Sequence, residues 1–356
     1  MAYLKLYRAK LQENHAQLER MFQEHGIDWG VVTKLLCGNR RYIQELVDLG
    51  VKEMHDTRIS NLKAIKAVAP AVQTVYIKPP AMRSIANVVK FADVSFNTEL
   101  TTMRALSAEA VKQDRVHKVI IMVEMGDLRV GVMGDELVEF YTDVFDLPNL
   151  EVIGLGTNLN CLNGVMPSAD KLIQLVLYKQ LIEARHGHMI QWVSGGTTVA
   201  MPLLLNKELP AGVNHFRIGE ALFFGADLFR GGTLPGMNEE VFELFTEVIE
   251  LYEKPVVPTG VQKENPTGRK AKFDPADRGR STYRAIVDVG LLDVQPQFLI
   301  PVDDRIKVIE ASSDMLVVDL GESTYDYKVG DIMRFRLKYM GALSMMNSRY
   351  IDKVVE

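Results

Sequence analysis

The sequence predicts a mixed α/β protein, an N-terminal (β/α)8 barrel of the TIM type followed by a C-terminal β-rich domain. Two observations predict this fold. Over the first two thirds of the chain, short apolar segments typical of strands alternate with amphipathic segments typical of helices. Over the last third, strand-like segments follow one another with no helix between them. Alternating strands and helices indicate parallel pairing, and eight such units in about 200 residues favour a closed barrel over an open sheet.

The individual elements follow from hydrophobic periodicity. A short strand is expected over residues 3–7, and a helix over residues 11–24, where Leu11, Leu18 and Phe22 recur at near-helical spacing. The barrel strands are then expected at residues 30–33, 51–54, 72–77, 93–96, 119–123, 152–154, 190–193 and 215–218.

The pattern changes after Gly232. A helix is expected over residues 238–251, and a long polar loop over residues 259–280, which are rich in Gly, Pro, Lys and Asp. Strands are expected at residues 285–289, 307–310, 315–319 and 333–339. The sequence therefore predicts a barrel over residues 8–232 and a β domain over residues 233–356, which the first strand, residues 1–7, joins.

Composition limits the class of function. The chain has 356 residues, 47% of them hydrophobic, enough for a large barrel and a smaller domain. A net charge of -5 gives no general reason to bind nucleic acid or an anionic membrane, so small-molecule chemistry is expected. No apolar run approaches the roughly 20 residues that cross a bilayer.

The cysteines and the N-terminus point to a reducing compartment. Cys37 and Cys161 lie far apart and in no metal-type spacing, so neither a disulfide framework nor a metal site is expected. Lys5, Arg8 and Lys10 occupy the place where a signal peptide has its apolar core. We therefore expect a cytoplasmic protein.

A lysine follows the first barrel strand. In a (β/α)8 barrel the active site lies where the strands end, and Lys34 follows the apolar run V-V-T. A partly desolvated amine at this place loses its proton readily, which Schiff-base formation requires. A lone lysine at a strand end can equally extend its amine into solvent.

Further candidates follow later strands. Arg129, in G-D-L-R-V-G, could hold a carboxylate or a cofactor oxygen, and Asn158, in T-N-L, could lie against a flat ring. Arg217 falls on the inner edge of the eighth strand. Small residues with free backbone N–H groups at two strand ends form a candidate phosphate cradle: Ser194, Gly195, Gly196, Thr197, Gly219 and Glu220. A surface arginine, a turn asparagine and ordinary tight turns are the alternatives for these residues.

The ordered set of these motifs resembles a known family. V-T-K, H-D-T-R-I-S-N-L-K, G-D-L-R-V-G, R-I-G-E-A and R-A-I-V-D-V-G are similar to the alanine-racemase-like enzymes that use pyridoxal 5′-phosphate, and within them to the ornithine racemase branch. The resemblance extends over nearly the whole chain. It implies an amino-acid racemase, an isomerase that interconverts L- and D-amino acids, with ornithine or a similar amino acid as substrate.

The resemblance also implies roles for single residues. Lys34 would carry the cofactor aldehyde as a Schiff base and act as one acid/base, and Arg217 would face the pyridine nitrogen. A permanently charged donor leaves that nitrogen unprotonated, which limits electron flow into the ring and favours racemisation over wider carbanion chemistry. The phosphate cradle would hold the phosphate. Asn158 would take the ring-stacking place, and Arg129 would lie near the cofactor hydroxyl and the substrate carboxylate.

One position departs from the family pattern. Alanine racemases supply a second acid/base from a tyrosine at the start of the β domain, where this chain has Leu291. Leucine transfers no proton, so the second group must come from elsewhere or be absent. Asp293 and Asp314 are the candidates, reaching the pocket of a neighbouring subunit in the homodimer that the resemblance implies. Both could instead be structural aspartates in β-turns.

Two other functions share the barrel and the cofactor. A lyase or dehydratase acting on D-amino acids is disfavoured, because such enzymes hold a metal with His and Cys in the β domain. No Cys follows Cys161 and no His follows His215. Decarboxylases of this fold need a cysteine in the same domain and are disfavoured for the same reason. A non-catalytic cofactor carrier or regulator would have no evident need for the residues after the barrel.

Overall fold

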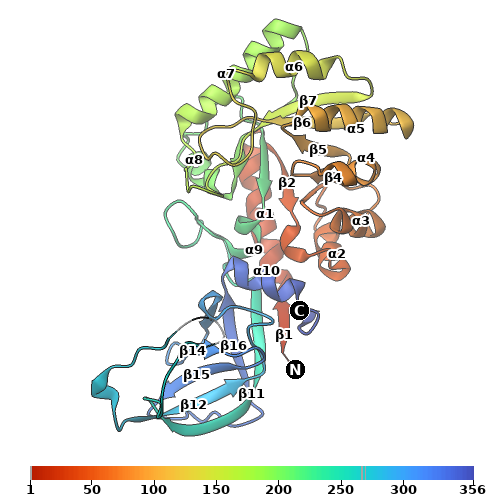
Figure 1. Cartoon of the computed structure of the whole chain (residues 1–356). Coiled ribbons are helices and arrows are strands. Elements are labelled where there is room, and N and C mark those ends of the chain that lie inside the picture. The colour runs from red at the N-terminus through yellow and green to blue at the C-terminus, as the bar shows by residue number, and fades with distance from the viewer. Residues whose placement is uncertain (1, 266–267, 269) are drawn as a thin grey trace. The chain divides into compact units, whose positions relative to one another are not determined.

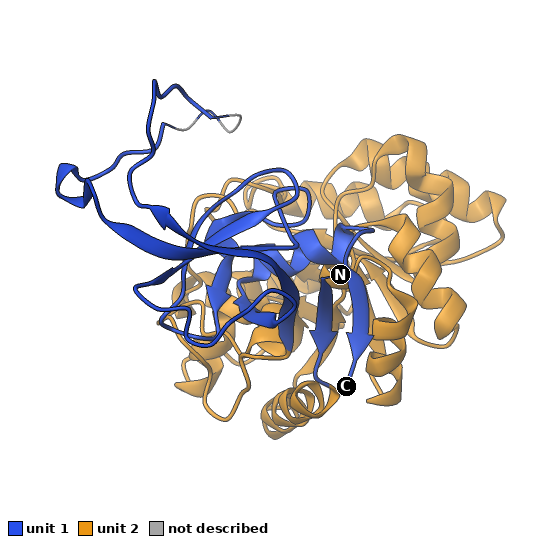
Figure 2. Cartoon of the chain, turned by 90° about the horizontal axis from the view of Figure 1, so that it is seen from below, with its two compact units in different colours: residues 1–7, 242–356 blue, residues 8–241 orange. Residues whose placement is uncertain are grey.

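The computed structural model describes residues 2–265, 268 and 270–356. The chain forms two compact units, one of residues 8–241 and one of residues 1–7 with 242–356 (Figure 2). The division expected from the sequence lay after residue 232. The joining of residues 1–7 to the C-terminal part follows from the pairing of the first strand with a strand that begins at Phe242.

The larger unit is a barrel of parallel strands surrounded by helices (Figure 1). Within the described residues its sheet has nine strands in the order β8-β7-β6-β5-β4-β3-β2-β10-β9. These strands are β2 (Asp28–Val32), β3 (Glu53–Asp56), β4 (Gln73–Tyr76), β5 (Val94–Asn97), β6 (His117–Met122), β7 (Leu150–Gly156), β8 (Trp192–Ser194), β9 (Gly196–Thr197) and β10 (His215–Ile218). Since Gly195 alone separates β8 from β9, the two ends of the sheet meet and the barrel is nearly closed.

Helices follow the strands as the alternating sequence pattern predicts. They are α1 (Arg8–Glu24), α2 (Arg40–Asp48), α3 (Ile59–Val68), α4 (Ile85–Phe91), α5 (Leu100–Lys112), α6 (Leu137–Phe145), α7 (Ala169–His186), α8 (Met201–Leu205) and α9 (Glu220–Phe224). Short 3-10 helices lie before α2, α4 and α8; they are η1 (Lys34–Leu36), η2 (Met82–Ser84) and η3 (Thr198–Ala200). The fold class predicted from the sequence is confirmed.

Strand β10 shows how the two faces of the barrel wall differ. Successive side chains of a strand point to opposite faces, so His215 and Arg217 share one face and Phe216 takes the other. The Phe216 ring packs against Phe22 of α1, with ring centres 5.1 Å apart. His215 and Arg217 are buried on the inside, where they meet Ser194 of β8. The interior of this barrel is therefore partly polar.

The smaller unit is an antiparallel sheet, as the helix-poor last third predicts. Its strand order is β13-β16-β11-β12-β15-β14, and β1 pairs antiparallel with β11 and parallel with β17. The bounds are β1 (Tyr3–Leu6), β11 (Phe242–Pro255), β12 (Ser281–Val287), β13 (Leu299–Pro301), β14 (Lys307–Ala311), β15 (Leu316–Gly321), β16 (Ile332–Leu337) and β17 (Asp352–Val355), with α10 (Tyr339–Asn347) and the 3-10 helices η4 (Pro275–Asp277) and η5 (Pro296–Phe298).

The helix expected over residues 238–251 is wrong. This segment forms most of the long strand β11, which pairs with β1, β12 and β16. Its first five residues, Phe242 to Thr246, are all buried, so no period-2 alternation is visible, and the apolar residues recur by chance at helical spacing. Aromatic and β-branched side chains, which favour strands, were the better signal. The expected loop at 259–280 includes residues 266, 267 and 269, which lie outside the described residues; the described remainder holds the short helix η4.

A search of the described residues for helices that are both long enough and apolar enough to cross a bilayer finds none.

The buried histidine of β6 predicts a pH dependence of stability. Burial, with a smaller effect of Arg115, lowers the pKa of His117 to about 4, and the ring makes a 2.8 Å hydrogen bond between Nε2 and Ser95 Oγ. Between the ordinary histidine pKa of 6.5 and this value, the unfolded chain binds a proton that the folded chain does not. This contribution to the free energy of unfolding is therefore lost as the pH falls from 6.5 to about 4.

His117→Gln is expected to reduce the slope of the free energy of unfolding against pH, by an amount that corresponds to at most about one bound proton per molecule. The slope is measured by urea denaturation across the same pH range. His25→Gln is the control, because His25 is an exposed histidine just after the end of α1. An identical slope in the wild type and His117→Gln would contradict the assignment.

Candidate active site

Lys34 lies at the carboxyl end of β2, where the sequence predicted it. Thr33 is buried, and its hydroxyl donates to Asp56 Oδ2 at 3.0 Å and to the His55 carbonyl at 3.1 Å. These bonds fix the end of the strand, and Lys34 begins the 3-10 helix η1 with an exposed side chain. Burial raises the pKa of Glu220, and the positive charge of Lys34 offsets part of that rise. The Lys34 amine therefore belongs to the same end of the barrel as the start of α9.

The glycine turns of the phosphate cradle lie beside Lys34. Strand β10 pairs with β2 on one side and with β9 on the other, so Lys34, Thr197 and Gly219 follow three neighbouring parallel strands. A Cβ at Gly196 would come within 2.3 Å of the Phe216 ring, and one at Gly219 would be 3.2 Å from the Cβ of Val32. The turn at Gly196 therefore requires glycine, and a side chain at Gly219 would meet a tight contact with Val32.

A hydroxyl joins the two turns. Thr198 Oγ1 accepts a hydrogen bond at 3.1 Å from the backbone N–H of Ala221 in the first turn of α9. The turns around Thr197 and Gly219 are thus joined at the strand ends, and successive backbone N–H groups in such turns can bind anions. Gly195 is buried among Leu172, Leu175 and Val213 and serves packing in this arrangement.

Arg217 is buried in the centre of the barrel. Its Nη1 donates to the Ser194 carbonyl at 2.7 Å and to Ser194 Oγ at 2.6 Å, and its Nη2 donates to the Thr157 carbonyl at 2.5 Å. Burial lowers the pKa of Arg217 to about 10, so the guanidinium keeps its charge at neutral pH. A guanidinium has five N–H donors, and these recorded bonds use three of them. Donors thus remain for an acceptor at the barrel mouth.

Behind Arg217 a column of hydrogen bonds runs down the barrel interior. The Ser194 hydroxyl, which accepts from Arg217, lies 2.6 Å from His215 Nδ1, and His215 Nε2 lies 2.8 Å from Glu53 Oε1. His55 Nε2 contacts the same oxygen, and Gln73 Nε2 donates to the other at 3.0 Å. Burial by itself raises the pKa of Glu53, but attraction to His55 and the histidine hydrogen bonds outweigh it and hold the pKa well below the usual range. Glu53 is therefore ionised.

Gly30 makes room for this column. A Cβ at Gly30 would lie 2.3 Å from His55 Nε2 and 2.5 Å from Glu53 Oε1. Glu53, His55 and His215 also form a group with metal-ligand chemistry, their ligand atoms lying within 4.8 Å of one another. The hydrogen bonds that both Nε2 atoms direct at Glu53 already use the positions that a metal ion would need.

Arg129 and Asn158 come together at the ends of β6 and β7. With the Asn158 amide oriented to satisfy both of its ends, its oxygen accepts from Arg129 Nη2 at 2.8 Å and from the backbone N–H of Leu159 at 3.3 Å. The carboxylate of Glu124 accepts from three backbone N–H groups of the loop that carries Arg129, including that of Arg129 itself at 3.1 Å. The arginine and the asparagine thus act as a pair.

The two aspartates proposed as the second acid/base lie in the smaller unit. Asp293 is buried, and its carboxylate accepts from Ser348 Oγ at 2.7 Å. Asp314 is exposed and accepts from the neighbouring Ser313 hydroxyl at 2.7 Å. The turns that carry them are paired, because the backbone N–H groups of Leu291 and Leu292 donate to the carbonyls of Ser312 and Ser313.

A surface cavity of about 540 Å³ surrounds Leu291 in this unit. Its lining includes Asp293, Ser348 and Tyr350, and the Tyr350 side chain is exposed. Tyr350 carries a phenol hydroxyl and was not among the residues singled out from the sequence, since the motif comparison looked only at the position of Leu291. The polar column of Glu53, His55 and His215 was also missed. Its only signal was charged and imidazole side chains at alternate positions of segments predicted to be strands.

The residues at the barrel mouth fit pyridoxal 5′-phosphate. The cofactor has an aldehyde, a ring nitrogen and a phosphate. The amine of Lys34 suits the aldehyde, the buried guanidinium of Arg217 suits the ring nitrogen, and the backbone N–H groups of the glycine turns suit the phosphate. All three lie on or after neighbouring strands. At one of these turns, Gly196, the Phe216 ring occupies the place of a Cβ, so only glycine fits there.

The attachment of Arg217 to Ser194 is testable by its effect on stability. Ser194→Ala removes an oxygen that accepts from Arg217 and is hydrogen-bonded to His215 Nδ1, so two buried groups lose a partner. We expect a loss of about 1–3 kcal/mol in the free energy of unfolding, measured by denaturant titration. Ser107→Ala, which removes one buried hydrogen bond to the Pro148 carbonyl, is the matched control and should cost less, about 1 kcal/mol. Equal losses of free energy in the two variants would show that the hydrogen bonds of Ser194 stabilise the fold no more than the single hydrogen bond of Ser107 does.

Comparison with known proteins agrees with this geometry. Residues 7–227 match the family model described as the N-terminal domain of alanine racemase. The chain is 35% identical over 345 residues to an ornithine racemase of Acetoanaerobium sticklandii, covering 97% of this chain and 96% of that protein. It is 33% identical over 347 residues to a lysine racemase of Thermotoga maritima, covering 98% and 96%.

Among solved structures, the alanine racemase of Bartonella henselae with covalently bound pyridoxal phosphate superposes with a TM-score of 0.74 at 14% identity, covering 100% of this chain and 99% of that one. This likeness shows the fold. With a family match along its barrel and two racemases aligned over nearly its whole length, the chain belongs to the alanine racemase family of amino-acid racemases.

Proposed function

We propose that this chain racemises a basic amino acid, with ornithine as the first candidate, by means of pyridoxal 5′-phosphate bound at the barrel mouth. The observation that carries the proposal is the buried, charged Arg217, which donates hydrogen bonds to Ser194 and Thr157. Arg217 lies on β10, which pairs with β2, the strand that Lys34 follows. The names of the two relatives support a basic substrate, since one is an ornithine racemase and the other a lysine racemase.

The residues would divide the work by position. When bound, the cofactor supplies an electron-withdrawing system that acidifies the α-hydrogen of the amino acid. Lys34 would hold the cofactor aldehyde and move a proton at its Nζ. Arg217 would donate to the ring nitrogen and, because it keeps its own proton, leave that nitrogen unprotonated. The N–H surface around Thr197, Gly219 and Glu220 would hold the phosphate.

The pair Arg129–Asn158 would orient the substrate. A guanidinium binds a carboxylate through parallel N–H donors, and the bond from Asn158 limits the positions that the Arg129 side chain can take. Binding of the substrate carboxylate in one orientation fixes which face of the α-carbon meets Lys34.

Racemisation also needs a proton donor and acceptor on the opposite face. We propose that it comes from the turn region around Leu291, with Asp293 and Asp314 as candidates from the sequence and Tyr350 as a candidate from the surface cavity. The hydrogen bond from Ser348 holds the Asp293 carboxylate in one position. As in the family resemblance, this region would act in the site of a second copy of the chain, in a homodimer. Two free cysteines in the described residues are consistent with a cytoplasmic location.

The role of Lys34 predicts a linked loss of colour and activity. Lys34→Ala is expected to abolish the visible absorbance of the cofactor-bound protein and to lower the racemisation rate by at least about 10² to 10⁴. The assay is exchange of deuterium from solvent into a panel of L-amino acids that includes ornithine, lysine and alanine. Lys63→Ala, which removes a lysine that lies over the Phe91 ring on the outside of the barrel, is the control. Full activity in Lys34→Ala would exclude the proposed chemistry.

The opposing acid/base predicts an asymmetric defect. If one of Asp293, Asp314 and Tyr350 acts on the face opposite Lys34, its replacement by Asn or Phe should stop deuterium exchange from one enantiomer. Exchange from the other, which needs Lys34 alone, should persist. Equal effects on both enantiomers, or none, in all three variants would remove these residues from the mechanism.

A further inference from the structure

A cavity of about 470 Å³ lies at the amino ends of the barrel strands, opposite the candidate active site. It is lined by the start of β2, by the chain that leads into β3, by β8 and by one side of α1. Its volume falls within the range of small-molecule sites. The charged lining groups are three carboxylates, those of Glu19, Asp28 and Glu53, and one ammonium, that of Lys52. Two indoles, those of Trp29 and Trp192, also line the cavity.

Glu53 forms the deepest charge of this cavity. It is buried, and attraction to His55 together with the hydrogen bonds from His215 and His55 holds its pKa well below the usual range, so it is ionised. His215 Nε2 lies 2.8 Å from Glu53 Oε1, His55 Nε2 contacts the same oxygen, and Gln73 Nε2 donates to Oε2 at 3.0 Å. These three partners fix the carboxylate in place where it lines the cavity.

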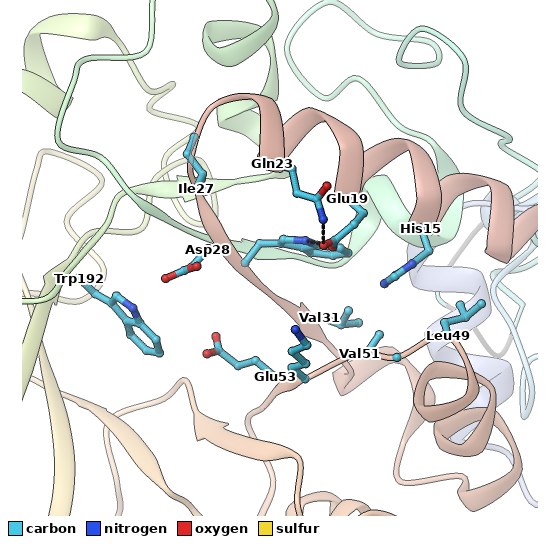
Figure 3. Close-up of a pocket in the computed structure, with 13 residues that line it drawn as sticks. His15, Glu19, Gln23, Ile27, Asp28, Val31, Leu49, Val51, Glu53 and Trp192 are labelled. Atoms are coloured by element: carbon cyan, nitrogen blue, oxygen red, sulfur yellow. Dashed lines mark hydrogen bonds between the residues drawn. The ribbon is translucent and has the colours of Figure 1, made fainter.

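The walls add negative potential and aromatic faces. In Figure 3 the carboxylates of Asp28 and Glu53 both point to the side of the cavity where Trp192 lies. The Trp29 indole donates to Glu19 at 2.9 Å, which fixes its ring in the wall. Burial lowers the pKa of His15, so this ring adds no charge of its own at neutral pH. Three carboxylates against the one ammonium of Lys52 give the lining an excess of negative charge, and carboxylates and indole faces attract cations.

We propose that this cavity binds a small organic cation of the alkylammonium class, with its charge against Glu53 and Asp28 and its carbon atoms against Trp29 and Trp192. A cation here would lie next to the end of the hydrogen-bonded column that runs from Arg217 through Ser194 and His215 to Glu53. The site is independent of the proposed racemisation, since it shares no residue with the barrel mouth.

An inorganic divalent ion fits the cavity less well. The imidazole groups of His55 and His215 lie behind Glu53 and direct their Nε2 hydrogens at it. The lone pairs that a transition metal requires are not presented to the cavity. The two indoles give a contact that suits carbon-bearing cations.

The chain supplies its own reporter for this site. It has two tryptophans, and both line the cavity. The experiment is a titration of the cofactor-loaded enzyme with tetramethylammonium chloride, followed by tryptophan fluorescence, against potassium chloride at equal ionic strength. Tetramethylammonium cannot react with an aldehyde, so it reports binding without chemistry. We expect a saturable change in emission with tetramethylammonium and none with potassium.

Four variants locate the probe. Glu53→Gln should weaken binding by about tenfold or more. Asp28→Asn, at the exposed rim, should weaken it to a smaller degree and covers the case in which Glu53→Gln fails to fold. Glu151→Gln removes an exposed carboxylate of β7 that does not line the cavity, and it should leave binding unchanged. Lys34→Ala should also bind normally, even if it has lost all racemase activity.

Three results would overturn the proposal. The first is a response to tetramethylammonium that does not saturate or that potassium reproduces. The second is binding that survives both Glu53→Gln and Asp28→Asn. The third is a response lost in Lys34→Ala, which would place the probe at the barrel mouth. Tight binding of Zn²⁺ that depends on His55 would likewise assign Glu53 to a metal site instead.

Discussion

The fixed position of Arg217 is the constraint on which the candidate site depends. A guanidinium buried in a barrel must have its donors satisfied, and the acceptors come from the ends of two other strands, at Ser194 and Thr157. The same hydrogen bonds hold the barrel strands in register at the level where Lys34 and the glycine turns follow. A change that frees Arg217 therefore alters the site and the wall of the barrel together.

The polar column beneath Arg217 explains why this barrel interior is not filled by branched aliphatic side chains alone. The column runs from Arg217 to Ser194, from Ser194 to His215 and from His215 to Glu53. It ends in an ionised carboxylate whose other oxygen accepts from Gln73. The guanidinium and this carboxylate are thus connected through hydrogen-bonding side chains, and Gly30 supplies the space that Glu53 and His55 need.

The two ends of the barrel consequently differ in the ligands that they suit. At the carboxyl ends, N–H groups and arginines favour an anionic cofactor and a substrate carboxylate. At the amino ends, three carboxylates and two indoles favour a cation. The smaller unit adds a different chemistry, because its paired turns around Leu291 and Ser313 gather carboxylates and an exposed tyrosine. The replacement of a tyrosine by Leu291 thus leaves proton-transfer groups in its neighbourhood.

The sequence by itself determined the barrel, the order of its strands and the positions of Lys34, Arg217 and the glycine turns, because strand periodicity and the barrel architecture place strand ends at one mouth. It misassigned β11, since a strand buried on both faces loses its alternation and tertiary pairing decides its form. Only the tertiary structure revealed that Ser194 serves Arg217, that Asn158 pairs with Arg129, and that Glu53, His55 and His215 form one group. These contacts join residues from separate strands, and no local pattern records which side chains a closed barrel brings within hydrogen-bonding distance.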